Sequence, residues 1–328
     1  LIVVRIFSFK MIFVTLLVTA DPALGRLDYS SLSQQALMEM VVSQLNEDNQ
    51  GAFKDSTSNF IDIEKWEGIW MNDDGTVQEV RWSSPRKKDK PKHQGTILLE
   101  WLPNTVEVFD IDDRGFEGEL DFLKLPKQLK ELRARSNWLK GSVILSNLPS
   151  DLESLEVPFN SLEGSIDLSI FPMKLKMFVV FHNSIGGMVR WSKKATALQF
   201  LHIGNNNIEG TIDLTQLPPN VTKLSCSANK FTGTLDFTSL PSKLRLLSLY
   251  NNALNGSVNL TCLPASLQKL YLNGNEFSGC LNLEILPEGL LELGLYANAF
   301  SGSIHLDKLP DGLQKLRLQG NNFSGSLC

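Results

Sequence analysis

Two histidines and one serine are the residues of this chain whose types could do chemistry together. Ser225 lies 23 residues after His202, and His182 lies 20 residues before it. A serine beside a histidine could supply a nucleophile and its base, and two histidines could begin a zinc site. However, Val179 stands where a carboxylate would orient the histidine, and no further metal ligands accompany the pair. The sequence also contains no nucleotide, zinc or hydrolase motif, so we expect no catalytic residues, no metal and no cofactor.

The four cysteines do not form the dense pattern of a disulfide scaffold. Cys226 stands where neighbouring repeats carry a core leucine, which predicts a buried thiol. Cys262 and Cys280 lie 18 residues apart on consecutive repeats, so the sequence is compatible with a disulfide or with two free thiols. Cys328 ends the chain.

These residues belong to a framework that repeats every 23 residues. A proline column with one vacancy, at Ala195, defines ten successive units without insertion or deletion. Its members are Pro103, Pro126, Pro149, Pro172, Pro218, Pro241, Pro264, Pro287 and Pro310. An asparagine column has the same period and is broken only by Arg114. It comprises Asn137, Asn160, Asn183, Asn206, Asn229, Asn252, Asn275, Asn298 and Asn321. A glycine follows four residues after each position of that column, from Gly118 to Gly325.

Each unit reads LxxLxLxxNx(L/F)xGx(L/I/V)x(L/F)xxLPxx. The LxL segment predicts a short strand with inward leucines, and stacked units predict a parallel sheet with strands ~4.8 Å apart. The chain then turns, and we expect Asn252 and its column to satisfy backbone groups that the sheet leaves unpaired, because an amide both donates and accepts. Gly256 supplies backbone freedom at the bend. One inward column is expected to form a spine of Phe231, Leu254, Phe277, Phe300 and Phe323. The second half of each unit alternates and ends in proline, which favours a short strand over a helix.

The repeat resembles the leucine-rich repeat, whose signature is LxxLxLxxNxL. The resemblance covers residues 102–328 and implies an α/β, horseshoe-shaped solenoid of ten 23-residue coils with a parallel concave sheet. An extended or short-strand convex side is similar to the plant-type members of the family, rather than to the helix-backed ribonuclease-inhibitor type.

Residues 21–101 are expected to cap the first coil, because a solenoid exposes its core at its end. Ser31 and Gln34 form a capping-box pattern ahead of an apolar face, which predicts a helix over about 31–46. The stretch "KWEGIWMNDDGTVQEVRW" predicts a hairpin turning at Asp74-Gly75 within about 66–101. Its tryptophans are expected in the core: Trp66, Trp70 and Trp82.

The "ALMEMV" helix, the tryptophan-rich hairpin and the 23-residue coils together resemble kinetoplastid leucine-rich-repeat surface proteins. They resemble plant leucine-rich-repeat receptors more distantly, because this chain lacks the paired cap cysteines of the plant pattern. The kinetoplastid resemblance implies a secreted or membrane-anchored surface protein that binds other macromolecules.

Composition and the N-terminus indicate where the protein works. The 328 residues are 42% apolar and 20% charged with a net charge of −5, which leaves no basic excess for nucleic acid. Arg5 and Lys10 precede "MIFVTLLVTA", and Val18-Thr19-Ala20 suits cleavage. Residues 1–20 are therefore predicted to be a secretory signal peptide, with a buried edge strand as the alternative, and the mature protein is expected to begin at Asp21.

No apolar run reaches the ~20 residues of a membrane span, so we expect any anchor to come from outside this sequence. Four glycosylation acceptors are predicted if the chain is secreted: Asn220, Asn255, Asn259 and Asn322. The basic stretch "PRKKDKPKHQG", residues 85–95, is compatible with a solvated loop or with a contact to an acidic partner.

The outward residues of the sheet strands decide function in this architecture. At the two ends of the sheet the outward residues alternate in charge from strand to strand, which predicts ion pairs between neighbouring strands that support their register. The predicted groups are Asp110, Arg133 and Glu156; Asp112 and Arg135; and Lys269, Glu292 and Lys315. In the middle they are apolar and aromatic, which predicts a partner site made of Met177, Val179, Phe181, His182, Phe200 and His202. A second aromatic stripe for glycan or protein contacts comprises Tyr250, Tyr271 and Tyr296. The alternative for the middle is a local distortion that buries these side chains.

The sequence therefore predicts a non-catalytic binding module, secreted or at the cell surface, whose concave face recognises a protein or glycan partner. The alternative is the ectodomain of a receptor kinase. It arises because the last coil breaks off in "NNFSGSLC" without a cap, so that more sequence is expected beyond Cys328.

Overall fold

The computed structural model describes residues 29–84 and 91–324. The predicted signal peptide, most of the basic stretch 85–95, Gly325 and Cys328 lie outside the described residues. A 3-10 helix, η1 (Tyr29–Ser31), belongs to a first unit that ends at Ser33, and a second unit extends from Gln34 to Cys328. The elements that follow all belong to the second unit. Within the described ranges, no helix is long and apolar enough to cross a membrane.

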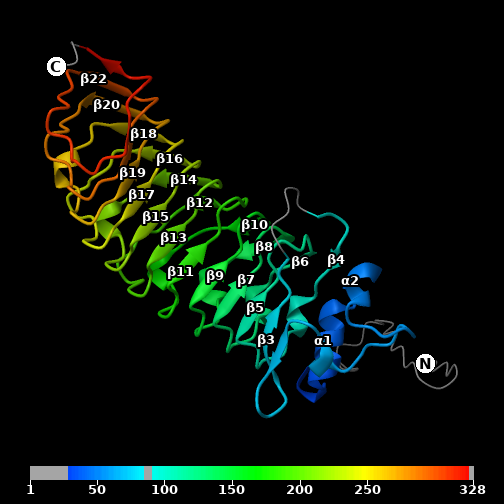
Figure 1. The fold of residues 1–328 in the computed structure, drawn as a ribbon. Coiled ribbons are helices and arrows are strands. Elements are labelled where there is room, and N and C mark those ends of the chain that lie inside the picture. Colours follow the sequence, from blue (N-terminus) through cyan, green and yellow to red (C-terminus); the bar gives the residue numbers. More distant parts are fainter. Residues whose placement is uncertain (1–28, 85–90, 325–328) are drawn as a thin grey trace. The chain divides into compact units, whose positions relative to one another are not determined.

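Ten short parallel strands recur with the period of the sequence and form most of a twelve-stranded sheet (Figure 1). They are β5 (Val108–Asp110), β7 (Glu131–Arg133), β9 (Ser154–Glu156), β11 (Met177–Val179), β13 (Phe200–His202), β15 (Lys223–Ser225), β17 (Leu246–Ser248), β19 (Lys269–Tyr271), β21 (Glu292–Gly294) and β23 (Lys315–Arg317). Leu247 pairs with Leu224 on one side and with Leu270 on the other. Because every coil has the same length, each sequence column stays in register along the whole sheet.

The return segment of each coil forms further short strands in two more sheets. One has five strands, β1 (Gln44–Leu45), β4 (Gly95–Thr96), β6 (Glu117–Glu119), β8 (Trp138–Val143) and β10 (Ser161–Gly164), of which β1 is antiparallel to β4. The other has seven, β12 (Gly186–Met188), β14 (Asn207–Thr211), β16 (Lys230–Gly233), β18 (Ala253–Gly256), β20 (Glu276–Cys280), β22 (Ala299–Gly302) and β24 (Asn322–Phe323). The outer side is therefore built from short strands, as expected.

One-turn 3-10 helices, which the sequence pattern did not predict, join five of these return strands to the next proline. They are η4 (Phe122–Lys124), η5 (Leu145–Asn147), η6 (Leu168–Ile170), η7 (Leu214–Gln216) and η8 (Leu260–Cys262). Four of them begin after an Asp or Asn whose side chain accepts a backbone N–H two residues later, as Asp213 does from Thr215 at 3.0 Å. The Asp or Asn at that position could have been used to predict these turns from the sequence, because such side chains favour turns.

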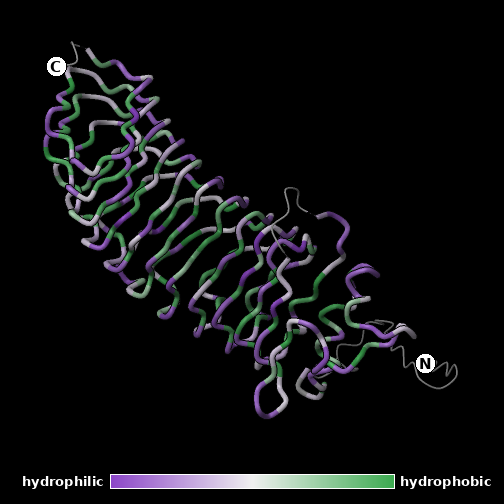
Figure 2. The backbone as a smooth tube through the Cα atoms, in the orientation of Figure 1, coloured by the Kyte–Doolittle hydropathy of each residue, from purple (hydrophilic) through white to green (hydrophobic). Residues whose placement is uncertain are grey.

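The core runs through the middle of the coils. The inward strand leucines from Leu132 to Leu293 are buried, and so are Phe231, Phe277 and Phe300 of the inward aromatic column. In the last coil, Leu316 and Phe323 are only half-buried. The rings of Phe277 and Phe300 stack with centroids 6.1 Å apart and planes within 10°. Figure 2 shows the corresponding alternation of hydrophobic and hydrophilic segments along each coil.

The N-terminal part of this unit contains the expected helix, but the helix is shorter than predicted. Helix α1 spans Gln34–Val42, shorter than the expected 31–46, because Gln44 and Leu45 pair with β4 instead. The Gln34 side chain reaches beyond the helix, since its Oε1 accepts the backbone N–H of Val77 at 3.1 Å. A second helix, α2 (Glu47–Gly51), begins at the Asn46 cap, and two 3-10 turns follow, η2 (Ile63–Lys65) and η3 (Leu99–Trp101).

The expected hairpin is formed by β2 (Ile69–Met71) and β3 (Val77–Arg81), and β3 continues the sheet by pairing with β5. Trp66 and Trp82 are buried beside it. Trp70 is not, and its prediction as a core residue is wrong: it is 49% exposed. It alternates with the half-buried Ile69 and Met71 on the edge strand β2, so its side chain lies on the open face.

Candidate functional site

The asparagine column forms a hydrogen-bonded ladder inside the coils. Asn206 is typical: its Oδ1 accepts the backbone N–H of Ile185 at 3.0 Å, and its Nδ2 donates to the carbonyls of Val180 and Ile203, both at 3.1 Å. The same contacts, to residues 21 and 26 positions earlier and 3 positions earlier, recur at Asn137, Asn160, Asn183, Asn229, Asn252, Asn275, Asn298 and Asn321. Each asparagine therefore binds its own coil and the preceding one.

Arg114, the one exception in the column, connects the first coil to the N-terminal elements. Its guanidinium donates to the carbonyl of Trp82 at 2.9 Å and to the Asn49 side chain at 2.7 Å. It also lies over the Phe116 ring, 5.0 Å from the centroid. An arginine reaches partners that the shorter asparagine amide could not, so the break in the column marks the junction.

The residue before each column position adopts a left-handed backbone conformation. Phe159 has a φ of 57° and His182 a φ of 59°, and Gly274 takes the same position in a later coil at 66°. A bulky residue in this region is unusual and strained. The turn places the Phe159 and His182 side chains beside the outward residues of the adjoining strands, where they meet other rings.

Aromatic rings from three consecutive coils form one row of stacked and edge-to-face contacts on the outward side of the twelve-stranded sheet, hereafter the strand face. The row comprises Phe159, His182, Phe181, His202 and Phe200, hereafter the aromatic ladder. Successive centroid distances are 4.6 Å from Phe159 to His182, 5.0 Å from Phe159 to Phe181, 4.2 Å from Phe181 to His202 and 6.1 Å from His202 to Phe200. Phe159 was missed by the sequence reasoning, although its size in a column otherwise mostly small or polar was a signal.

The aromatic ladder is partly open to solvent. Phe159, Phe181 and Phe200 are half-buried and His182 is exposed, while Met177 is half-buried beside them. Val179 is different: it points outward but is only 5% exposed. Glu156 and His202 flank it on the neighbouring strands, so their larger side chains cover the valine. The prediction of Val179 as an exposed contact is therefore wrong.

His202 pairs in register with Ser225, but its ring stacks on Phe181. Burial lowers the pKa of His202 to about 4, so the ring is neutral near pH 7. A neutral imidazole packed face to face with a phenyl ring belongs to the apolar surface of the ladder. Among the described residues, no group of three or more His, Cys, Asp or Glu side chains is placed to hold a metal ion.

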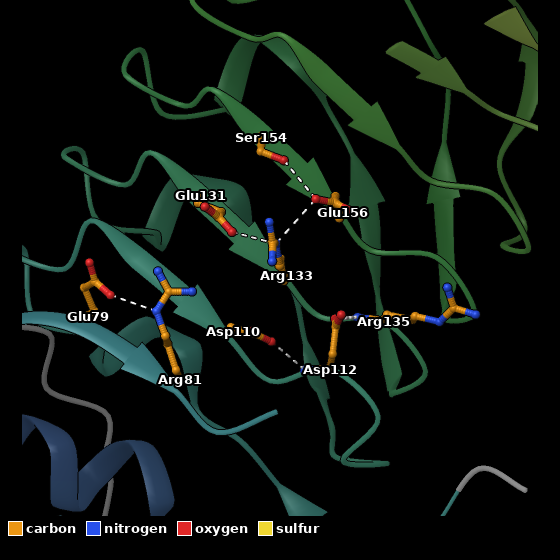
Figure 3. A network of polar contacts seen from close by, with 9 residues as sticks. All are labelled: Glu79, Arg81, Asp110, Asp112, Glu131, Arg133, Arg135, Ser154 and Glu156. Atoms are coloured by element: carbon orange, nitrogen blue, oxygen red, sulfur yellow. Dashed lines mark hydrogen bonds and ion pairs between the residues drawn. The ribbon is translucent and has the colours of Figure 1, made fainter. Parts of the chain in front are cut away.

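The charged outward residues before the aromatic ladder form a polar network (Figure 3). Arg133 pairs with Glu156 at 3.4 Å, as expected, and also with Glu131 at 2.6 Å. Asp110 is buried and accepts the backbone N–H of Asp112 at 3.0 Å, rather than the expected bond from Arg133. Burial raises the pKa of Asp112 to about 6.

Arg135 does not pair with the Asp112 carboxylate through its side chain. The carboxylate accepts the backbone N–H of Arg135 at 2.6 Å, and Figure 3 shows the guanidinium extending away from it. The guanidinium instead lies over the ring of Phe159, 4.9 Å from the centroid. The alternation of charge thus predicted that Arg135 lies next to Asp112 on the neighbouring strand, but not the direction in which its side chain extends.

A second feature of the strand face is a cavity of about 230 Å³ that contains all three predicted tyrosines, Tyr250, Tyr271 and Tyr296. Glu292 lies in it, accepting bonds from Lys269 at 2.7 Å and from the Tyr271 hydroxyl at 2.7 Å, with Lys315 at 3.3 Å. The Lys269 and Tyr271 bonds lower the pKa of Glu292 to about 2. Burial, together with the Glu292 carboxylate, raises the pKa of Tyr271 to about 12. Arg317 also lines the cavity.

The glycosylation candidates differ in how free their amides are. Asn255 and Asn322 are exposed on β18 and β24. Asn220 donates to the Thr196 carbonyl at 2.9 Å and accepts from Lys243. Asn259 caps η8 by accepting the Thr261 N–H at 3.1 Å. The sequons therefore occupy two kinds of position, free and hydrogen-bonded.

The thiols of Cys226, Cys262 and Cys280 are free, and Cys226 is fully buried.

A larger hollow of about 1010 Å³ lies over β6 and β8, where Trp138 donates to the Pro91 carbonyl at 2.7 Å. It contains none of the predicted partner residues.

No protein-family model and no curated protein matches the sequence. Solved structures of plant leucine-rich-repeat ectodomains do match. The plant peptide hormone receptor RGFR1 in complex with RGF2 is 28% identical, with a TM-score of 0.61, over 69% of this chain and 37% of the receptor. The ectodomain of the membrane receptor kinase GASSHO1/SCHENGEN3 from Arabidopsis thaliana, in complex with CASPARIAN STRIP INTEGRITY FACTOR 2, is 26% identical, with a TM-score of 0.54, over 68% of this chain and 29% of that one.

A plant ice-binding protein matches over 89% of this chain and 87% of its own, with a TM-score of 0.61 and 21% identity, which shows the fold alone. The chain thus has the leucine-rich-repeat solenoid fold and resembles plant receptor ectodomains, although it spans only 37% and 29% of the two receptors' lengths. The same fold hosts different functions, so the fold by itself does not assign one to this chain.

Proposed function

We propose that this chain is a non-catalytic binding module that recognises an extended segment of a protein or glycan through its strand face. The observation that carries the proposal is the aromatic ladder, in which half-exposed rings in stacked and edge-to-face contact span neighbouring coils. Contiguous apolar surface on a soluble protein marks interaction sites, and aromatic side chains supply much of the energy in such sites. The matched receptor ectodomains were solved with RGF2 and with CASPARIAN STRIP INTEGRITY FACTOR 2, which supports a ligand of similar kind here.

The tyrosine cavity is the second part of the proposed face. Tyr250, Tyr271 and Tyr296 present both ring surfaces and hydroxyls, which suits amphipathic contacts to a peptide or a sugar. Tyr250 and Tyr296 lie three and five coils beyond Phe181, so a ligand lying along the solenoid would need to span at least ~14 Å to reach both regions.

The experiment compares ligand selection by the native protein and by variants. A displayed random-peptide library and a glycan array are probed with the native chain, with Phe181→Asp, with Phe200→Asp and with Met188→Asp as the matched control. Met188 is 71% exposed on β12, away from the strand face. We expect ligands that bind the native chain and the control but not the two ladder variants. Ligands that bind all four proteins equally would refute the strand face as the site.

Far-UV circular dichroism and urea unfolding of each variant separate lost binding from lost folding. If Phe181→Asp unfolds, Phe181→Ser serves in its place, because it removes the ring without burying a charge.

We further propose that the protein acts outside the cell, secreted or at the cell surface, as a glycoprotein. The likeness to receptor ectodomains, the predicted signal peptide at residues 1–20 and the exposed Asn255 and Asn322 support this. N-terminal sequencing of the native protein tests cleavage before Asp21, and protease treatment of intact cells tests exposure. Residues 1–20 recovered on a protease-resistant protein inside the cell would contradict it.

Two finer proposals follow from resemblance. Kinship with kinetoplastid surface proteins rests on the cap and repeat pattern of the sequence. The alternative of a receptor-kinase ectodomain is supported by the likeness to GASSHO1/SCHENGEN3. Sequencing the gene beyond residue 328 decides the second proposal, since a kinase requires its own recognisable motifs there.

A further inference from the structure

The two ends of the aromatic ladder are both capped by cations. Arg135 lies over Phe159 with its Cζ 4.9 Å from the centroid, and Lys223 lies over Phe200 with its Nζ 5.4 Å from the centroid. The ladder therefore continues as an unbroken row from a guanidinium, through rings, to an ammonium.

Neither cation has a carboxylate partner among the residues that the structure describes. Arg133 and Lys269 on the same face do have such partners: Arg133 pairs with Glu131 and Glu156, and Lys269 with Glu292. The Nε atoms of Arg133 and Arg135 are both buried without a hydrogen-bond partner, but of the two only Arg133 has carboxylates beside it. A guanidinium held on a ring keeps its fork of donors for an incoming acceptor, and burial makes that acceptor more valuable.

We infer that the ligand of this face is an extended peptide with apolar side chains between two acidic residues, which Arg135 and Lys223 bind. This inference rests on the proposed function and specifies its ligand. The backbones of Arg135 and Lys223 lie four coils apart, which is about 19 Å along the solenoid at ~4.8 Å per coil. An extended chain covers that distance in about six residues at ~3.3 Å each.

Alternate residues of an extended peptide point to the same side, so the two acids and the apolar residues between them face the ladder together. This specifies a probe, the fluorescent peptide Glu-Ser-Phe-Ser-Leu-Ser-Glu. Two matched peptides carry Gln or Lys at both ends. Fluorescence anisotropy gives the Kd of each for the native chain, Arg135→Gln, Lys223→Gln and the control Arg190→Gln, whose side chain is exposed and pairs with Asp167.

We expect the Glu-ended peptide to bind the native chain at least fivefold more tightly than the Gln-ended one, the effect of one well-placed charge pair at an end. The Lys-ended peptide should bind most weakly, and added salt should narrow these differences. Arg135→Gln and Lys223→Gln should each reduce the preference for Glu ends, while leaving the Kd of the Gln-ended peptide unchanged. Arg190→Gln should behave as the native chain does.

Equal Kd values for the three peptides, or no binding by any of them, would overturn this inference. The proposed function would survive that result if library ligands are still lost in Phe181→Asp and Phe200→Asp. Aromatic rings flanked by cations could also stack bases and hold phosphates, so single-stranded oligo(dT) is included as a competitor. Tighter binding of oligo(dT) than of the Glu-ended peptide would likewise overturn the inference.

Discussion

Replacing Asn206 by alanine tests the hydrogen-bonded ladder where the environment is most fully defined. Asn206 is 9% exposed, and its Oδ1 accepts from Ile185, which is itself fully buried. Asn206→Ala leaves the Ile185 N–H without a partner. The carbonyls that Asn206 binds lose less, because Val180 keeps a bond from Asn183 and Ile203 keeps one from Asn229.

The expected cost is therefore that of a single orphaned donor, ~1–3 kcal/mol in the free energy of unfolding. Urea unfolding followed by circular dichroism measures it as a lower midpoint with an unchanged slope. Asn207→Ala is the matched control, because Asn207 is exposed on β14 and lies outside the column. Coincident midpoints for Asn206→Ala and the native protein would refute the reasoning that the ladder satisfies otherwise unpaired backbone groups.

Asn206→Asp sharpens the test, because it keeps the acceptor for Ile185 but turns a carboxylate oxygen toward backbone carbonyls. Only the protonated carboxyl can donate there, so the folded state should raise the pKa of this group. The folded chain would then bind more protons than the unfolded one above the ordinary pKa of ~3.9, and its stability should increase as the pH falls toward that value. A variant whose deficit relative to the native protein does not shrink on acidification would contradict this geometry.

Three further predictions concern pH, backbone and the tyrosine cavity. Burial lowers the pKa of His202 to about 4 from 6.5, so the unfolded chain binds more protons between these values. The stabilisation is fully present above pH 6.5 and is lost as the pH falls to about 4, and His202→Gln should flatten the urea midpoint across that window. Gly256 has a φ of 80°, and an added Cβ would lie 2.7 Å from the Thr234 Cγ2, so Gly256→Ala should lower the free energy of unfolding by ~1–2 kcal/mol, only partly restored by Thr234→Ala. Burial, together with the Glu292 carboxylate, raises the pKa of Tyr271 to about 12, so Glu292→Gln should move that pKa part of the way toward 10.0 in an ultraviolet absorbance titration, and an unchanged value would contradict the assigned hydrogen bond.

The repeat period made the fold predictable, because a constant coil length forces equivalent residues into the same column. The pairing of Leu247 with Leu224 and Leu270 follows from that arithmetic alone. The positions at which helices and strands begin and end depend on other interactions. The first helix stops early because Gln44 and Leu45 gain strand partners, which its apolar periodicity does not reveal.

The candidate site was less predictable. The position of a residue in the repeat determines whether its side chain leaves the backbone inward or outward, but not which neighbouring side chains cover it. Val179 starts outward, yet Glu156 and His202 on either side enclose it. Phe159 belongs to a turn column, and only its left-handed backbone brings the ring into the row. The turn of Arg135 away from Asp112 likewise depends on the ring that it finds nearby.

The asparagine ladder has a consequence for how such a protein can change its length. Asn252 completes the turn of the coil before it by binding Phe231 and Cys226, and Asn275 does the same for the next turn through Leu254 and Leu249. After the removal or duplication of one whole coil, every remaining turn still meets an equivalent asparagine amide. Any other change in length would leave the backbone groups of one turn without that partner. Gene segments that encode single coils can be lost or gained without an unmatched polar group, and each such step moves the two ends of the strand face by ~4.8 Å.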